Sequence, residues 1–122
     1  MTEKKSDEAA VLEKVAAWDE PYAEIGRRLH AIITETAGLQ PRLWYGMPGY
    51  AKAKNSPVIC FFRVDDLMSF GLTEKANLAQ ADGAADKLIP SAWFLTDLDA
   101  HTEARIADIV TSAAGRPRRE TT

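Results

Sequence analysis

The sequence predicts a single α+β domain: a mostly antiparallel, curved sheet of about five strands, with N- and C-terminal helices packed on it. Its 122 residues are the size of one domain with one core. Apolar residues recur with helical spacing towards both ends of the chain, whereas alternating or continuous apolar runs occupy the middle. The connections between these middle runs are short, which favours hairpins and therefore antiparallel neighbours.

Composition and charge narrow the classes of function. The apolar fraction of 46% and the charged fraction of 27% are typical of globular proteins. With 15 basic and 18 acidic residues, the net charge of −3 produces no field that would attract nucleic acid or an anionic membrane. The single cysteine excludes an intramolecular disulfide, the first residues are polar, and the longest apolar run, Val58 to Phe62, is too short to cross a bilayer. We therefore expect a cytoplasmic protein without a membrane or nucleic-acid partner.

Four segments are expected along the chain. Residues 1–7 read as a flexible tail, 8–18 as a short N-terminal helical arm, 19–115 as the α+β domain, and 116–122 as a flexible tail. The arm either lies against the domain or binds a partner, and the first alternative is favoured.

The first long helix is predicted over Pro21 to Ala37. Asp19-Glu20-Pro21 is a start signal, because an acceptor side chain caps free amides and proline fits the first turn. Gly38 is expected to end the helix in the left-handed conformation. Gly26 lowers helix propensity, which suggests a close approach to the sheet. The apolar face consists of Tyr22, Ile25, Leu29, Ile32, Ile33 and Thr36.

The next segments read as strands. Arg42 to Tyr45 is expected to be extended, with Trp44 on the face opposite its two neighbours. Gly46 to Gly49 is expected to form a bend, and extended structure resumes from Tyr50 to Ala53. Val58 to Val64 is apolar on both faces, as is typical of a central strand.

The second half of the chain completes the fold. Asp65-Asp66 joins the central strand to a hairpin partner over Leu67 to Leu72, and Thr73 is expected to cap a short helix to about Gln80. Ala92 to Leu95 is the last strand. The final helix begins near Asp99, has Glu103 in its first turn, and presents an apolar face of Ile106, Ile109, Val110 and Ala113.

The glycine-rich aromatic stretch carries a family resemblance. Trp44-Tyr45-Gly46-Met47-Pro48-Gly49-Tyr50, the strand with Phe61-Phe62, the later Phe70-Gly71 strand and the terminal helix together resemble the YdhG-like family, a bacterial domain of unknown function. The likeness covers roughly Tyr22 to Ala114, and its most specific piece is the pattern Trp-x-Gly-Met-Pro-x-Tyr. The resemblance implies an α+β fold with a curved antiparallel sheet. For some bacterial members it also implies a frataxin-like iron chaperone.

An iron site would need exposed carboxylates, because iron ions favour oxygen ligands. The candidates are Asp65 and Asp66, Asp82 and Asp86, and the group of Asp97, Asp99 and Glu103 with His101 among them. Capping and the helix dipole explain Asp99 and Glu103 without a metal, and this interpretation is favoured. Iron is therefore a possible cofactor with unknown ligands, and otherwise no cofactor is expected.

No catalytic constellation is found. Cys60 lies in the apolar run, where a buried cysteine acting as a small hydrophobe is favoured over a nucleophile. His30, placed on the polar side of its helix, and His101 lack the spacing of a zinc site. We expect a protein that is not an enzyme.

The leading hypothesis is a non-enzymatic binding domain. Its ligand or partner surface is predicted to consist of Trp44, Tyr45, Met47 and Tyr50, which supply flat walls, an adaptable thioether and hydroxyl groups. The occupant is a small molecule or a protein, and a homodimer is left open. The alternatives are an iron-binding chaperone that uses surface carboxylates, a small enzyme with an acid-base site, and aromatics that only build the fold.

Overall fold

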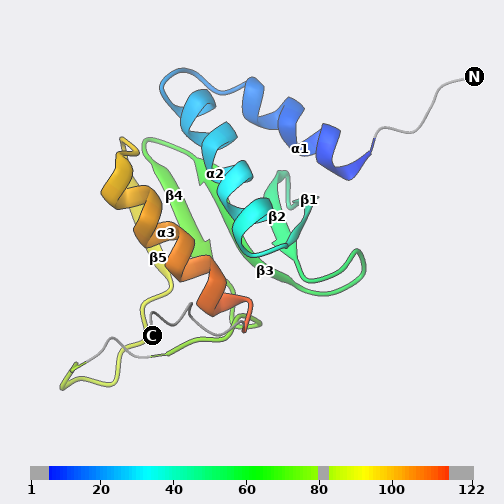
Figure 1. Ribbon diagram of the computed structural model, residues 1–122. Helices are drawn as coiled ribbons and strands as arrows, with labels where there is room; N and C mark the ends of the chain where they lie inside the picture. Colours follow the sequence, from blue (N-terminus) through cyan, green and yellow to red (C-terminus); the bar gives the residue numbers. More distant parts are fainter. Residues whose placement is uncertain (1–5, 80–82, 116–122) are drawn as a thin grey trace, which may run out of the picture.

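The computed structural model describes residues 6–79 and 83–115 and confirms the predicted α+β fold (Figure 1). The helices are α1 (Asp7–Ala16), α2 (Tyr22–Thr36) and α3 (Ala100–Ala113); the strands are β1 (Gln40–Trp44), β2 (Met47–Ala51), β3 (Val58–Val64), β4 (Met68–Leu72) and β5 (Ala92–Leu95). The helices that begin near Pro21 and Asp99, and the strands Val58–Val64 and Ala92–Leu95, lie where the sequence predicts them.

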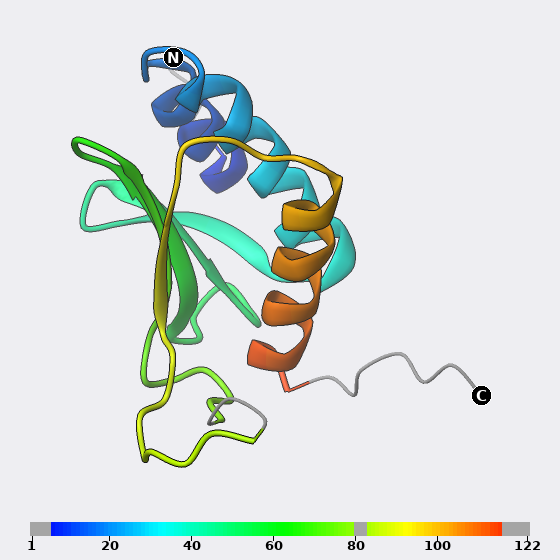
Figure 2. The ribbon, with the colours of Figure 1, turned by 90° about the vertical axis from the view of Figure 1, so that its left-hand side faces the viewer.

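The sheet has the order β1-β2-β3-β4-β5, and each strand is antiparallel to its neighbour in sequence. Figure 2 shows the three helices on one side of the sheet, while the turns of β1–β2 and β3–β4 project on the other side. Of the described helices, none covers that second side, which we call the open face. None of them is long and apolar enough to span a membrane either.

One hydrophobic core lies between the helices and the sheet. Its largest fully buried side chains are Val11 and Val15 of α1, Leu29 and Ile33 of α2, Val110 of α3, and Pro48, Tyr50, Cys60, Phe62, Met68 and Phe70 of the sheet. Because side chains alternate along a strand, Cys60 and Phe62 fix which face of β3 points towards the helices. Phe61 and Arg63 consequently lie on the open face.

Helix α1 is part of this core and not a separate arm. Ser6 caps it by accepting a hydrogen bond from the amide of Ala9, and Val11 and Val15 are fully buried. This confirms the favoured alternative, in which the arm of residues 8–18 lies against the domain. The close approach at Gly26 was assigned to the wrong partner: a β-carbon there would lie 2.7 Å from Cγ1 of Val15, so the contact is with α1 and not with the sheet.

The turn between β1 and β2 lies earlier than predicted. Trp44 pairs with Met47, so the turn consists of Tyr45 and Gly46, which have φ of 53° and 79°. Two positive φ angles match the twist of a tight hairpin. Pro48 stays in β2 because the pairing of β2 with β3 runs from Gly49 to Ala51 and leaves the proline outside that ladder.

The short helix predicted from Thr73 is absent over residues 73–79. The hydroxyl of Thr73 donates to the carbonyl of Val58 and accepts from the amide of Lys75, which makes a turn in place of a cap. Asn77 donates from its backbone amide to Ala113 and from its side chain to Ser112. These hydrogen bonds attach residues 73–77 to β3 and α3 without a helix. Gln80 lies outside the described residues.

Candidate binding surface

An aromatic surface lies on the open face of the sheet. It consists of Trp44, Tyr45, Met47, Phe61 and Phe94, and this set is called the aromatic surface below. The pairs Trp44–Met47, Gly49–Phe61, Phe61–Gly71 and Ser69–Phe94 place these side chains on the side of the sheet away from the buried residues of β2 and β3.

Three rings of the aromatic surface, those of Trp44, Tyr45 and Phe61, contact one another through Trp44. The ring centroids of Trp44 and Phe61 are 5.2 Å apart, and those of Trp44 and Tyr45 are 4.8 Å apart in an edge-to-face arrangement. These separations fall in the favourable range for aromatic pairs. The exposed fraction is 85% for Tyr45 and 74% for Phe94. The surface therefore has a packed centre and two protruding rings.

Two strand glycines let the rings lie close to the sheet. A β-carbon on Gly71 would lie 2.7 Å from Cζ of Phe61, and one on Gly49 would lie 2.8 Å from Cβ of Trp44. Both distances are shorter than a carbon–carbon contact allows, so the ring of Phe61 and the β-carbon of Trp44 occupy space that a side chain at residue 71 or 49 would fill. The ring of Phe61 therefore fills this part of the open face and leaves no hollow above Gly71.

The charged groups beside the aromatic surface already have partners. Nη1 of Arg42 donates to the carbonyl of Lys54 at 2.7 Å. Nη2 of Arg63 lies 2.7 Å from a carboxylate oxygen of Asp65, and the hydrogen bond that Arg63 donates to this carboxylate raises the pKa of Arg63. Arg63 is thus paired with an opposite charge, whereas Arg42 keeps its positive charge beside the aromatic surface.

Tyr50 does not belong to this surface, so its inclusion among the predicted binding residues is wrong. It is fully buried on the helix side of β2, where its ring stacks with Phe62 at 5.8 Å. The alternation of a strand explains the error, since Met47 and Tyr50 are three residues apart and point to opposite faces. Trp44, Tyr45 and Met47 remain together.

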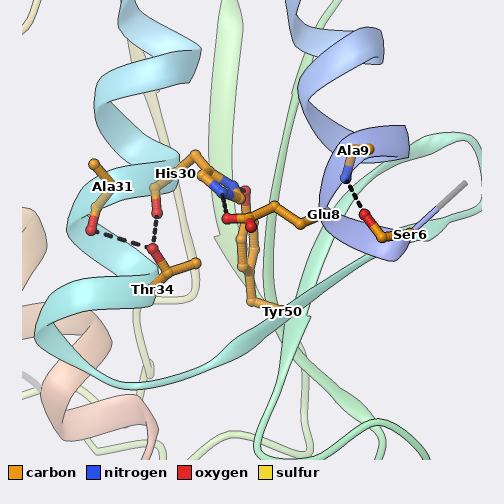
Figure 3. Close-up of polar contacts among 7 residues, drawn as sticks. All are labelled: Ser6, Glu8, Ala9, His30, Ala31, Thr34 and Tyr50. Atoms are coloured by element: carbon orange, nitrogen blue, oxygen red, sulfur yellow. Dashed lines mark hydrogen bonds and ion pairs between the residues drawn. The ribbon is translucent and has the colours of Figure 1, made fainter.

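Tyr50 instead ends a buried polar relay that the sequence did not reveal (Figure 3). Its hydroxyl oxygen lies 2.9 Å from Nδ1 of His30, and Nε2 of His30 lies 2.8 Å from a carboxylate oxygen of Glu8. Burial raises the pKa of the Tyr50 hydroxyl, with smaller contributions from Cys60 and Glu8. His30 therefore faces the core rather than the polar side of α2, and the relay ties α1, α2 and β2 together.

Cys60 is fully buried in β3, as the sequence predicts. Burial alone raises the pKa of its thiol, which disfavours the thiolate. The residue acts as a small apolar side chain of the core.

Several of the candidate iron ligands have partners within the protein. Asp99 caps α3 by accepting from the amide and the hydroxyl of Thr102, and these hydrogen bonds lower the pKa of Asp99. Glu103 forms an ion pair with Arg28, and Asp97 accepts from the amide of Leu98. Over residues 6–79 and 83–115, no group of three or more His, Cys, Asp or Glu side chains is placed to hold a metal ion. Asp82 lies outside the described residues.

A cavity of about 180 Å³ lies away from the aromatic surface. It is formed by the first turn of α1, by β1 and by the segment that follows β2, and its lining residues are Asp7, Glu8, Gln40, Pro41, Arg42, Ala53 and Lys54. Glu8 already binds His30, and Arg42 already binds a backbone carbonyl. None of the aromatic surface residues lines this cavity.

Sequence reasoning missed Phe61 and Phe94 as surface residues. The signal for Phe94 was available, because Trp93 and Phe94 are consecutive in a strand and only one of them can face the core. Phe61 lies in a run that is apolar on both faces, so its exposure depends on which layer covers the sheet. Comparison of the chain with family models, with curated proteins and with solved structures finds no match in any of the three.

Proposed function

We propose that the protein is a non-enzymatic binding domain that holds a protein partner against its aromatic surface. The observation that carries this proposal is the exposure of Tyr45 and Phe94, at 85% and 74%, on the sheet face that none of the described helices covers. Contiguous exposed apolar side chains mark interaction sites, because covering each ring is worth roughly 1.5–3 kcal/mol.

The shape of the surface supports a protein over a small molecule. Sites for small molecules are concave and enclose most of the ligand. The ring of Phe61 lies over Gly71 and fills the space that the glycine leaves open on this face. A flat apolar face with a few protruding aromatics is typical of protein interfaces.

The backbone of Tyr45 gives independent support. This residue adopts φ of 53°, a conformation that bulky side chains rarely adopt and that costs of order 1–3 kcal/mol. The turn needs a positive φ there, yet Asn or Gly would meet that need with less strain. A tyrosine that is both strained and 85% exposed is explained by contact with a partner.

The polar relay supports the non-enzymatic part of the proposal. Glu8, His30 and Tyr50 are residue types of an acid-base system, but the Tyr50 hydroxyl is enclosed by the core. Tyr50, at 0% exposure, has no surface at which to meet a substrate, and the 58% exposed side chain of Glu8 is held by Nε2 of His30. We assign the relay to stability.

The proposal also includes two expectations from the sequence: that the domain resembles the YdhG-like family and that the protein is cytoplasmic. The two-layer α+β architecture and the hairpin built from Trp44 to Tyr50 support the first. A single buried cysteine, Cys60, without a disulfide partner supports the second.

Photo-crosslinking from residue 45 tests the proposal. Tyr45 is replaced by the photoreactive p-benzoylphenylalanine, and cells that express the protein are irradiated. Because residue 45 protrudes from the surface, we expect one discrete cross-linked species. The measurement is its mass on a denaturing gel and by mass spectrometry.

The matched control carries the same photoreactive residue at Asp108, which is exposed on α3 in the helix layer. We expect no discrete species from position 108. The absence of a species from position 45, or the same pattern from both positions, would refute the proposed binding function.

A further inference from the structure

The cavity beside β1 is lined by charges of both signs. Asp7 and Glu8 belong to the first turn of α1, whereas Arg42 belongs to β1 and Lys54 to the segment that follows β2. Elements that are far apart in the sequence therefore bring two carboxylates and two cations to one cavity. The dipole of α1 favours acidic residues in its first turn, but it does not account for the two cations.

These opposite charges are not paired with one another. Among residues 6–79 and 83–115, no ion pair joins the carboxylate of Asp7 or Glu8 to Arg42 or Lys54, so their charged atoms stay more than 4.0 Å apart. A cavity that separates carboxylates from cations is complementary to a molecule that carries both charges. A simple cation or a simple anion would meet a like charge there.

Two of the charged side chains are already held in place by the protein. Nε2 of His30 lies 2.8 Å from a carboxylate oxygen of Glu8, whose side chain remains 58% exposed (Figure 3). Nη1 of Arg42 donates to the carbonyl of Lys54 at 2.7 Å, and a guanidinium has further N–H donors. Side chains that are fixed before binding lose less entropy when a ligand arrives, so both groups are suited to ligand recognition.

The size of the cavity restricts the ligand to a small molecule. Sites for drug-sized ligands measure roughly 300–1,000 Å³, whereas this cavity measures about 180 Å³. Pro41 and Ala53 also line it and offer apolar contact to a short side chain. A free amino acid with a short side chain combines this size with both charges.

From these observations we propose that the cavity is a binding site for a small zwitterion, a free amino acid with a short side chain. The ammonium group of the ligand donates to the carboxylates of Asp7 and Glu8. Its carboxylate accepts from the guanidinium of Arg42, and Lys54 adds positive charge. The site is separate from the aromatic surface, so this inference does not depend on the proposed function. Because Glu8 also contacts His30, a ligand at this carboxylate changes the environment of the imidazole.

NMR titration of the ¹⁵N-labelled chain with L-alanine and with β-alanine tests the site. The two probes differ in the separation of their ammonium and carboxylate groups. We expect at least one of them to bind with a dissociation constant on the order of 1 mM, because a ligand of so few atoms has limited affinity. The backbone amides of Glu8 and Arg42 and the ring nitrogens of His30 should shift with one common dissociation constant. Methylamine and acetate, which carry one charge each, should bind at least about tenfold more weakly.

Asp7→Asn and Arg42→Gln each remove one charge from the cavity. Each is expected to raise the dissociation constant of the tighter probe at least about tenfold. The matched controls Asp108→Asn and Arg105→Gln make the same changes at exposed positions of α3 and should leave this constant unchanged. Far-UV circular dichroism checks the fold of every variant. If Arg42→Gln alters the fold, Lys54→Gln tests the cationic side instead, because Lys54 is exposed.

Three results would overturn the inference. The first is the absence of shifts at Glu8, Arg42 and His30 with both zwitterions. The second is binding of methylamine or acetate as tight as that of the zwitterions. The third is binding by the cavity variants that equals binding by their α3 controls.

Discussion

Phe61 and Gly71 depend on each other at the centre of the aromatic surface. The ring of Phe61 occupies the space that a β-carbon of residue 71 would take. An aromatic ring that covers a strand glycine replaces the packing that the glycine lacks. The pair therefore stabilises the sheet and also flattens its open face.

Gly71→Ala is expected to destabilise the fold by about 1–3 kcal/mol, because the added carbon would overlap Phe61 at 2.7 Å. Urea unfolding followed by circular dichroism measures this cost. In a Phe61→Ala background the same substitution should cost at least about 1 kcal/mol less. An equal cost in both backgrounds would show that the ring and the glycine are not coupled.

Tyr50 and Tyr45 provide a second test at the level of single residues. Tyr50→Phe removes the hydroxyl that lies 2.9 Å from Nδ1 of His30 and leaves that nitrogen buried without its partner, at a cost of about 1–3 kcal/mol. Tyr45→Phe removes a hydroxyl from a side chain that is 85% exposed and should change stability by less than about 0.5 kcal/mol. Thermal unfolding of the two variants in parallel compares them. Equal effects would contradict a stabilising role for the relay.

Contact between α1 and α2 is set at Gly26. A β-carbon on residue 26 would lie 2.7 Å from Cγ1 of Val15 and 3.0 Å from Cζ3 of Trp18. Glycine lowers helix propensity by about 1 kcal/mol relative to alanine. This cost in α2 accompanies the close packing of α1, which a side chain at residue 26 would prevent. This approach buries Val15 fully and brings Glu8 within reach of His30.

Gly26→Ala should therefore destabilise the protein despite the gain in helix propensity, by about 1 kcal/mol or more. In a Val15→Ala background, the substitution should cost at least about 1 kcal/mol less, because the closest atom is gone. Denaturant unfolding of the four members of this cycle measures the coupling. If Gly26→Ala stabilises the wild-type chain, α1 does not pack as closely as the structure shows.

Periodicity predicted the elements well wherever one face of an element is buried. The helix before Gly38 and the strand Val58–Val64 lie where the pattern places them, and Gly38 has the expected positive φ of 68°. The turn at Tyr45 was missed because tyrosine is a poor turn residue and the glycines and the proline beyond it dominate the local pattern. The turn at Thr73 was missed because its hydroxyl bonds to a distant strand, which no local pattern records.

The candidate site was predictable only in part. The high density of aromatic residues identified the stretch that contains Trp44, Tyr45 and Met47. It did not show which face of the sheet each side chain occupies, so Tyr50 was included although it lies in the core. Phe94 is 50 residues beyond Trp44 in the sequence, and the sheet order that sets it on the same face follows from tertiary structure. Long-range placement of this kind requires the fold.

The molecule as a whole has two layers, and this architecture explains why a binding surface is available. All three helices lie on one side of a sheet in which every strand pairs with its sequence neighbour. With one core between the layers, apolar residues on the second sheet face are left exposed. The same core contains Val11 near the start of the described residues and Ala114 near their end.

A core shared by all the helices predicts that the domain unfolds as one unit. Trp18, which follows α1, packs its ring edge-to-face on Phe62 at 5.8 Å, while Trp93 of β5 stacks on Phe70 at 5.8 Å. Variants that keep only Trp18 or only Trp93 report separately on the segment after α1 and on β5, which pack on the paired residues Phe62 and Phe70. In urea, the fluorescence midpoint of each variant should coincide with its own circular dichroism midpoint, as in two-state unfolding. If the Trp18 signal changes at lower urea than the circular dichroism of the same variant, α1 detaches before the domain unfolds and the single core is contradicted.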